Sequence, residues 1–266
     1  MSDITGKDNE FAFVTYLNGR KINELNPMFK SLIDTLFPWE YETSKINSWL
    51  NKNPEKSDIF VKINGKVKGI SIKKGYKNSV HVERITDFIH FLIENKVDRD
   101  IVIKYLQYHY ADGSTNGKGA KRLSTKEYKE YHQRDIDKIN KVFNNENLLT
   151  KAIDRFVLKG NNSPSKIDAL VYGEVDSFLF LTRKDIINII ISKRKEYSTG
   201  VHFGCLSVQP KNRCLNYNKK YEKDRYCVQL KWFNLNDSII EYMNKRVMMQ
   251  SKMPNWRQSN YFIHAI

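Results

Sequence analysis

Residues 57–75 read SDIFVKINGKVKGISIKKG, and this stretch decides the fold that we expect for the chain. Two runs suited to β-strands, 58–63 and 66–73, lie on either side of Asn64-Gly65. Asn-Gly is the strongest short signal for a hairpin, because both central residues of a type I′ turn need a positive φ. The sequence therefore predicts an antiparallel hairpin with a two-residue turn, in which Asp58 lies opposite Ser71.

This hairpin has one polar and one apolar face. Side chains alternate along a strand, so Asp58, Ser71 and Lys73 share a face. The isoleucines and the valine at positions 59, 61, 63, 70 and 72 share the other face, which we expect to be buried. An aspartate and a lysine held close together can bind a hard divalent cation and orient a water molecule. The alternative is an ordinary amphipathic hairpin whose charged face is solvated.

The pattern resembles the PD-(D/E)XK nucleases, the restriction endonuclease-like superfamily. In that family an aspartate opens one strand, and an acidic residue, one spacer and a lysine follow on the next. The matching positions here are Asp58, Ser71 and Lys73, and the resemblance covers roughly residues 8–95. Ser57 stands where the family pattern has a proline, but this proline is often absent in family members. Ser71 replaces the usual carboxylate, so the resemblance implies that another element supplies the second acidic ligand.

Two glutamates are candidates for this second carboxylate. Residues 9–17 read as a helix that places Glu10 on an apolar face with Val14 and Leu17. The family often has a glutamate on its first helix, so we favour Glu10 over the glutamates at positions 24, 40 and 42. Glu83, at the start of an expected helix that continues to Leu92, is the second candidate. For both, the alternative is a favourable interaction with the helix dipole.

The resemblance also implies a role for each residue. Asp58 and Glu10 would hold Mg²⁺ together with the carbonyl oxygen of Ile72. Lys73 would orient or activate the attacking water. Ser71 would be a spectator or a hydrogen-bond donor to the ligands.

Composition favours a globular protein with a polyanionic partner. The 266 residues carry a net charge of +15, and 40% are hydrophobic. Lysine and arginine in such excess favour nucleic acid, because they neutralise phosphates. We find no apolar run long enough to span a membrane and no secretory signal. The three cysteines have no metal-binding spacing, which suggests a reducing cytoplasm.

The rest of the chain alternates between expected helices and strands. Expected helices begin at Asn26-Pro27, around Ile46 to Leu50, after Asp98, at the Ser124 and Glu127 capping box, at Glu146, and at the Thr182 and Asp185 cap. Expected strands cover 167–172, 177–181, 201–208 and 225–232.

Basic residues gather in two expected loops and beside the hairpin. The loop 110–122 is glycine-rich, and it is either mobile or ordered by the DNA backbone. The connection between the last two strands mixes basic and aromatic residues, which suits phosphate and base contacts, although a solvated loop is the alternative. The expected DNA-binding residues are Lys74, Lys118, Lys121, Arg122, Lys211 and Arg213. Asp168, on a later strand without a matching lysine motif, is interpreted as structural.

These features together predict an α/β protein with a restriction endonuclease-like core, a mixed central sheet flanked by helices, and a smaller C-terminal α+β lobe. We place the nuclease core with a helical extension at 1–160 and a β-rich DNA-recognition lobe at 161–266, although both could form one integrated domain. The expected function is Mg²⁺-dependent cleavage of double-stranded DNA by a homodimeric, cytoplasmic type II restriction endonuclease with a cognate DNA methyltransferase. A repair or recombination nuclease, a decayed core that only binds nucleic acid, and an RNA substrate are the alternatives.

Overall fold

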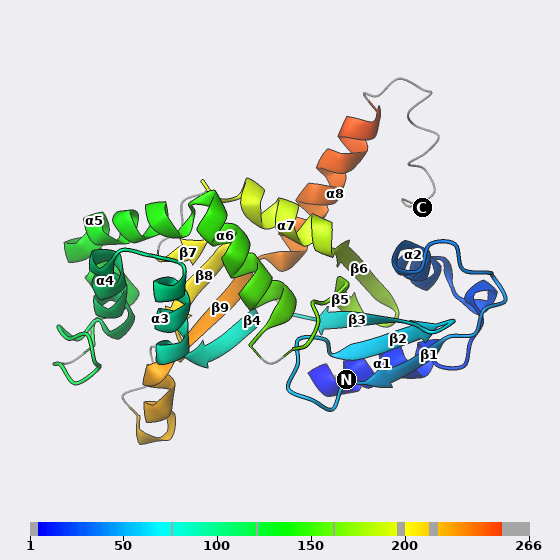
Figure 1. Ribbon diagram of the computed structural model, residues 1–266, viewed down its shortest axis with the longest axis horizontal. Coiled ribbons are helices and arrows are strands. Elements are labelled where there is room, and N and C mark those ends of the chain that lie inside the picture. Colours follow the sequence, from blue (N-terminus) through cyan, green and yellow to red (C-terminus); the bar gives the residue numbers. More distant parts are fainter. Residues whose placement is uncertain are drawn as a thin grey trace. The chain divides into compact units, whose positions relative to one another are not determined.

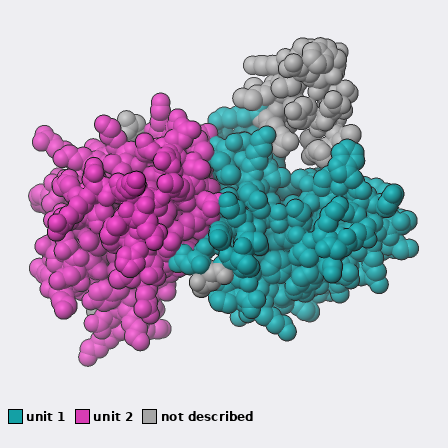
Figure 2. Space-filling view, viewed as in Figure 1, with its two compact units in different colours: residues 1–76, 158–189, 234–266 teal, residues 77–157, 190–233 magenta. Residues whose placement is uncertain are grey.

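The structure, a computed structural model, describes residues 5–75, 77–120, 122–161, 163–195, 200–212 and 218–251. The chain forms two compact units (Figure 2). Unit 1 comprises residues 1–76, 158–189 and 234–266, and unit 2 comprises 77–157 and 190–233. This division differs from the expected one at residue 160, because residues on both sides of that position contribute to each unit.

Unit 1 is built on a mixed five-stranded sheet (Figure 1). Its strand order is β1 (Asn47–Leu50), β2 (Ile59–Ile63), β3 (Lys66–Lys73), β5 (Ala169–Glu174) and β6 (Ser177–Thr182). β3 and β5 are parallel, and the other neighbours are antiparallel. The hairpin has the expected register, with Ile59 opposite Ile70. Asn64 and Gly65 both have positive φ, as a type I′ turn requires.

Helices accompany this sheet in unit 1. They are α1 (Gly6–Leu17), the short η1 (Ile22–Glu24), α2 (Pro27–Leu36), α7 (Arg183–Ser192), which continues into unit 2, and α8 (Leu235–Ser251). Phe13 of α1 and Phe29 of α2 are fully buried with the isoleucines of the hairpin. α2 begins with the expected Asn26-Pro27 cap, and Asn26 accepts a hydrogen bond from the Phe29 N–H.

One expectation in unit 1 was wrong. We expected a helical segment around Ile46 to Leu50, but residues Asn47–Leu50 form the edge strand β1. Ser48 is buried and Trp49 is exposed, so burial alternates as in a strand. The backbone pairs with β2 along this edge, and that tertiary pairing outweighs the helical spacing of the apolar residues.

Unit 2 contains an antiparallel sheet in the order β4 (Lys77–Arg84), β9 (Cys227–Phe233), β8 (Leu206–Pro210) and β7 (His202–Phe203). Four helices come after β4 and before β7 in the chain: α3 (Ile85–Glu94), α4 (Arg99–Tyr110), α5 (Thr125–Phe143) and α6 (Glu146–Ala152). The helix η2 (Ile153–Lys159) comes after α6, and η3 (Lys219–Tyr226) comes before β9. Phe88, Phe143, Phe156 and Phe203 form an aromatic core. The expected capping box of α5 is present, with Ser124 and Glu127 each bonded to the other's backbone.

Two further expectations are corrected in unit 2. Residues 77–84 form strand β4 instead of the start of a helix, because they pair along their length with β9. The helix begins only at Ile85. The expected strand 201–208 is divided into β7 and β8 by a turn at Gly204, whose φ of 53° favours glycine.

Gly69 of β3 allows the chain to pack closely just before the aspartate of interest. A Cβ atom at Gly69 would lie 2.2 Å from the Oγ atom of Ser57, which is buried and precedes Asp58. The substitution Gly69→Ala is therefore expected to lower the free energy of unfolding by about 1–3 kcal/mol, as overpacking of a filled interior does. Urea unfolding measures this.

The matched test is the double variant Gly69→Ala with Ser57→Gly. Removing the serine side chain makes room for the new methyl group, so the double variant should lose less stability than the two single losses added together. Additive losses of stability would contradict a close contact between the new methyl group at position 69 and the side chain of Ser57.

Candidate active site

One carboxylate oxygen of Asp58 accepts the hydrogen bonds of the residues around it. Asp58 lies immediately before β2, and its backbone N–H donates to the Ile70 carbonyl at 2.8 Å. Its Oδ2 atom accepts hydrogen bonds from the Ile72 N–H at 2.6 Å, the Ser71 hydroxyl at 3.0 Å and the Lys73 ammonium at 3.3 Å. Among the described residues, all hydrogen bonds to this carboxylate end on Oδ2, so Oδ1 is available to a ligand.

Lys73 lies between two oxygen atoms of this cluster. Its Nζ atom is 3.3 Å from the Asp58 carboxylate and donates to the Ile72 carbonyl at 3.1 Å. The side chains of Lys73 and Asp58 are 23% and 22% exposed. The ammonium group is thus held by the protein and still accessible to a molecule from solvent.

Glu10 lies within the electrostatic field of the same pair. Burial raises the pKa of the Glu10 carboxyl, the charge of Asp58 raises it further, and Lys73 partly offsets the increase. Glu83, the second candidate, is buried in β4 of unit 2, where its carboxylate lies 2.9 Å from Arg155 and 3.3 Å from His81. Of the two candidates, Glu10 is therefore the one that the structure places near Asp58.

The oxygen atoms of this cluster fit a hard divalent cation. Asp58 Oδ1, the Glu10 carboxylate and the Ile72 carbonyl are ligands of the kind that Mg²⁺ prefers, and Mg²⁺ commonly binds through one or two carboxylates while keeping several waters. Ser71 is 2% exposed and donates to Asp58, so it supports the ligand and adds no carboxylate. No group of three or more His, Cys, Asp or Glu side chains that could hold a metal occurs in the described part of the chain.

Asp168 has structural partners, in keeping with its interpretation from the sequence. Its carboxylate accepts from the Gly69 N–H at 3.0 Å and lies 3.3 Å from both Lys68 and Arg183. These two cations neutralise the carboxylate, and the backbone bond fastens β3 to the start of β5.

Most of the described residues that we expected to bind DNA have protein partners. Lys74 lies 3.2 Å from Glu174, Lys211 lies 3.0 Å from Asp224, and Arg122 donates to the His109 carbonyl. Lys118 is exposed. Lys121 and Arg213 lie outside the described residues. DNA contacts by these six residues stay a prediction.

The glycine-rich loop 110–122 has a feature that the sequence analysis missed. Asp112 is buried and accepts from Ser114 and from the Gly119 N–H, and it also forms an ion pair with Arg225. An aspartate followed two residues later by serine is a turn signal that could have been recognised. The carboxylate organises the loop from within unit 2.

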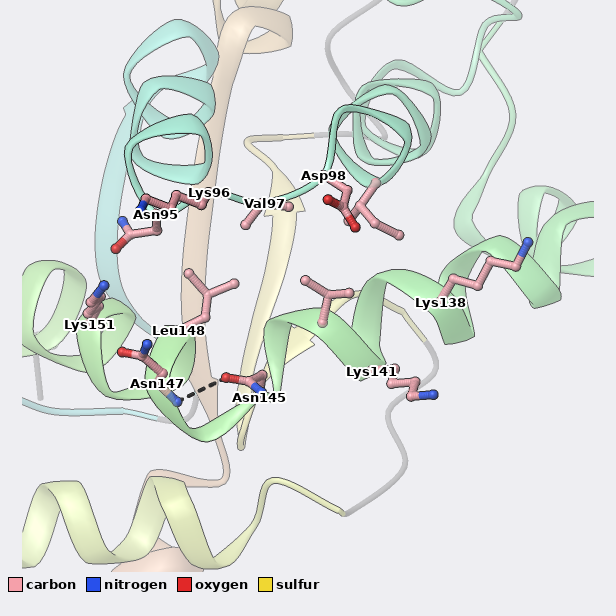
Figure 3. Close-up of a pocket in the computed structure, with 12 residues that line it drawn as sticks. Asn95, Lys96, Val97, Asp98, Lys138, Lys141, Asn145, Asn147, Leu148 and Lys151 are labelled. Atoms are coloured by element: carbon pink, nitrogen blue, oxygen red, sulfur yellow. Dashed lines mark hydrogen bonds between the residues drawn. The ribbon is translucent and has the colours of Figure 1, made fainter.

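A separate cavity in unit 2 does not contain the expected site residues (Figure 3). Its volume is 480 Å³, and its lining has an apolar part formed by Val97, Ile101, Val142 and Leu148. The lysines at its edge are Lys96, Lys138, Lys141 and Lys151. Asp98 is the one acidic residue among the lining residues, so the cavity lacks the paired carboxylates of the hairpin cluster.

Comparisons with known proteins address the fold. No protein-family profile and no curated protein sequence matches the chain. A solved structure does match: the restriction endonuclease MspI in complex with its cognate DNA aligns over 85% of this chain and 88% of its own, with a TM-score of 0.55 and 13% sequence identity. The chain has the restriction endonuclease-like fold.

The restriction endonuclease-like fold confirms the fold class expected from the hairpin. The mixed five-stranded sheet with its flanking helices matches the core that the resemblance implied, and the second, smaller sheet is consistent with the same fold. In this fold Ser71 and Lys73 lie on β3, Asp58 immediately precedes β2, and Glu10 lies on α1. No helix in the described ranges is both long and apolar enough to cross a membrane.

The cluster geometry predicts opposite effects of two substitutions on Glu10. Asp58→Asn removes a negative charge and should lower the pKa of Glu10, whereas Lys73→Met removes a positive charge and should raise it. NMR titration of glutamate side-chain carboxyl carbons labelled with ¹³C measures both. Lys62→Met, at an exposed position elsewhere on the hairpin, is the matched control and should leave the titration unchanged. A shift of the Glu10 pKa in the same direction in both variants would show that Asp58 and Lys73 do not act on Glu10 as nearby opposite charges.

Proposed function

We propose that the protein is a Mg²⁺-dependent endonuclease that cleaves double-stranded DNA. The observation that carries this proposal is the convergence of Asp58, Lys73, the Ile72 carbonyl and Glu10 on a sheet of the restriction endonuclease-like fold. Carboxylates for a cation and an amine for a water molecule are the groups that phosphodiester hydrolysis requires.

Each side chain has a distinct part in this chemistry. Asp58 and Glu10 would hold the cation with the Ile72 carbonyl, and Ser71 would fix the orientation of Asp58. The bound cation supplies Lewis-acid stabilisation of the charge that develops on the phosphate. Lys73 would orient the attacking water and assist its deprotonation, because its ammonium group is held 3.3 Å from Asp58 and is partly open to solvent.

DNA as the substrate is supported by charge and by the structural likeness. A net charge of +15 favours a polyanion. MspI, which shares the fold, is described as bound to its cognate DNA. We extend the proposal to sequence-specific cleavage of the type II kind. A homodimer would bring two active sites to a symmetric target, and a cognate methyltransferase would protect host DNA.

Activity on plasmid DNA tests this proposal. With Mg²⁺, the wild-type protein should convert unmethylated plasmid or phage DNA into discrete fragments. Asp58→Asn, Glu10→Gln and Lys73→Ala should each lower the cleavage rate by at least about 100-fold, because each removes a cation ligand or the group that positions the water. Lys62→Ala keeps the hairpin and should retain activity.

Three outcomes would argue against parts of the proposal. Tight, salt-sensitive DNA binding without cleavage under any divalent cation would favour a decayed core, with Ser71 as the lost acidic ligand. Cleavage that survives Asp58→Asn would place the active site elsewhere. Preferential cutting of branched DNA over plain plasmid would favour a repair or recombination nuclease.

Cation binding should depend on pH through Glu10. Its pKa is raised in the free protein, so a proton competes with the cation for this carboxylate. The apparent affinity for Mn²⁺ is therefore expected to fall as the pH falls through the raised pKa, with proton release on binding. Isothermal titration calorimetry in buffers of different ionisation enthalpy measures both effects.

The Glu10→Gln variant is the control for this dependence. It should bind Mn²⁺ more weakly at neutral pH but with a shallower pH dependence, because the titrating ligand is gone. An unchanged slope in this variant would show that Glu10 does not hold the cation.

A further inference from the structure

The sheet of unit 2 has one face that its own helices bury and one that they leave open. Helices α3, α4 and α5 contact the sheet, and its strands supply the fully buried Val208, Val228, Leu230 and Trp232 to the core. The alternate residues along the same strands point the other way. Six of them, each exposed or partly exposed, define what we call the polar sheet face: Ser79, Val82, Arg84, Gln209, Gln229 and Lys231.

Strand register places these side chains in two rows across the sheet. In one row Gln209 lies opposite Gln229, and Gln229 lies opposite Val82. In the other row Lys231 lies opposite Ser79, while the hydroxyl of Ser207, its neighbour on β8, is buried. Directly opposed side chains in a sheet are about 5 Å apart, so each row is a compact set of neighbouring groups.

Several of these groups have hydrogen-bonding capacity that no described residue uses. Within the described part of the chain, no residue bonds to the side-chain amide of Gln209 or to the guanidinium group of Arg84, which is exposed. The amide nitrogen of Gln229 donates to the Ser79 hydroxyl at 3.0 Å, while no described residue donates to its carbonyl oxygen. Val82, 42% exposed, presents an apolar contact beside them.

The charge of this face matches a nucleic acid. None of its six side chains is a carboxylate, and Arg84 and Lys231 are cations. The acidic residue of β4, Glu83, lies on the opposite, buried face. Amides, a hydroxyl and an apolar group between two cations are suited to base edges flanked by phosphates.

We propose that the polar sheet face reads base edges in the major groove of double-stranded DNA, with Gln209 and Gln229 as specificity-determining residues. Strands of a β-sheet can enter the major groove, and a glutamine amide can pair with N6 and N7 of adenine. The major groove of double-stranded RNA is too narrow for such reading. This proposal rests on the proposed function in one respect, since it takes DNA to be the partner.

Selection from a random duplex library tests the proposal without cleavage. The full-length wild-type protein in EDTA should enrich a defined sequence motif. Gln209→Leu and Gln229→Leu should each lose about 5- to 150-fold in discrimination at one or more motif positions, while their affinity for non-specific DNA stays within about threefold. Gln107→Leu, an exposed glutamine of α4, is the matched control and should keep the wild-type motif.

Further variants distinguish a loss of base recognition from a loss of the folded structure. Gln209→Glu and Gln229→Glu keep the shape of the side chain, and each should shift the preference toward cytosine, whose N4 donates to a carboxylate. An unchanged motif in all four variants, or no motif with the wild-type protein, would overturn the proposal. A motif that depends on the two glutamines in a protein that cleaves no DNA would overturn the proposed function and leave this inference intact.

Discussion

The hydrogen bond from the Ile72 N–H to the Asp58 carboxylate, at 2.6 Å, is the interaction on which the candidate site depends. This bond occupies one carboxylate oxygen of Asp58 and extends the contact between the two hairpin strands to the residue before β2. The other carboxylate oxygen is left for a ligand. Ser71 and Lys73 converge on the first of these oxygens because strand alternation places them on that face. A slip of one residue in the hairpin register would turn the isoleucines toward solvent and the charged residues into the core. Burial of the apolar face therefore fixes which residues lie on the polar face.

The position of Glu10 depends on how α1 is anchored. Phe13 and Leu17 bury one side of this helix in the core of unit 1. The neighbouring Asn9, itself buried, donates from its side-chain amide to the Gly173 carbonyl at 2.9 Å and so ties the first turn of the helix to β5. A carboxylate on an apolar stripe is thus held near Asp58 by packing and by one hydrogen bond, which explains why its pKa is raised in the free protein.

The local parts of this fold could be predicted because local chemistry determines them. Asn64-Gly65 defined the hairpin and its register, Asn26-Pro27 defined the start of α2, and the pair Ser124 and Glu127 defined the start of α5. The strand around Trp49 and the strand β4 were predicted as helical, because their apolar spacing fits both structures and the pairing with distant strands decides. The division into units was not foreseen, since it depends on which distant segments pack together. The site was predicted from the hairpin and the first helix, yet the ion pairs of Lys74 and Lys211 could be seen only in three dimensions.

The proposed function requires that Asp58, Glu10 and the Ile72 carbonyl hold one divalent cation beside Lys73. The most direct test is anomalous diffraction from crystals of the wild-type protein grown with Mn²⁺. One strong anomalous peak is expected in contact with both carboxylates and the Ile72 carbonyl, and this peak should be lost in Asp58→Asn. A peak bound by other residues, or no peak at cation concentrations that support DNA cleavage, would contradict this requirement.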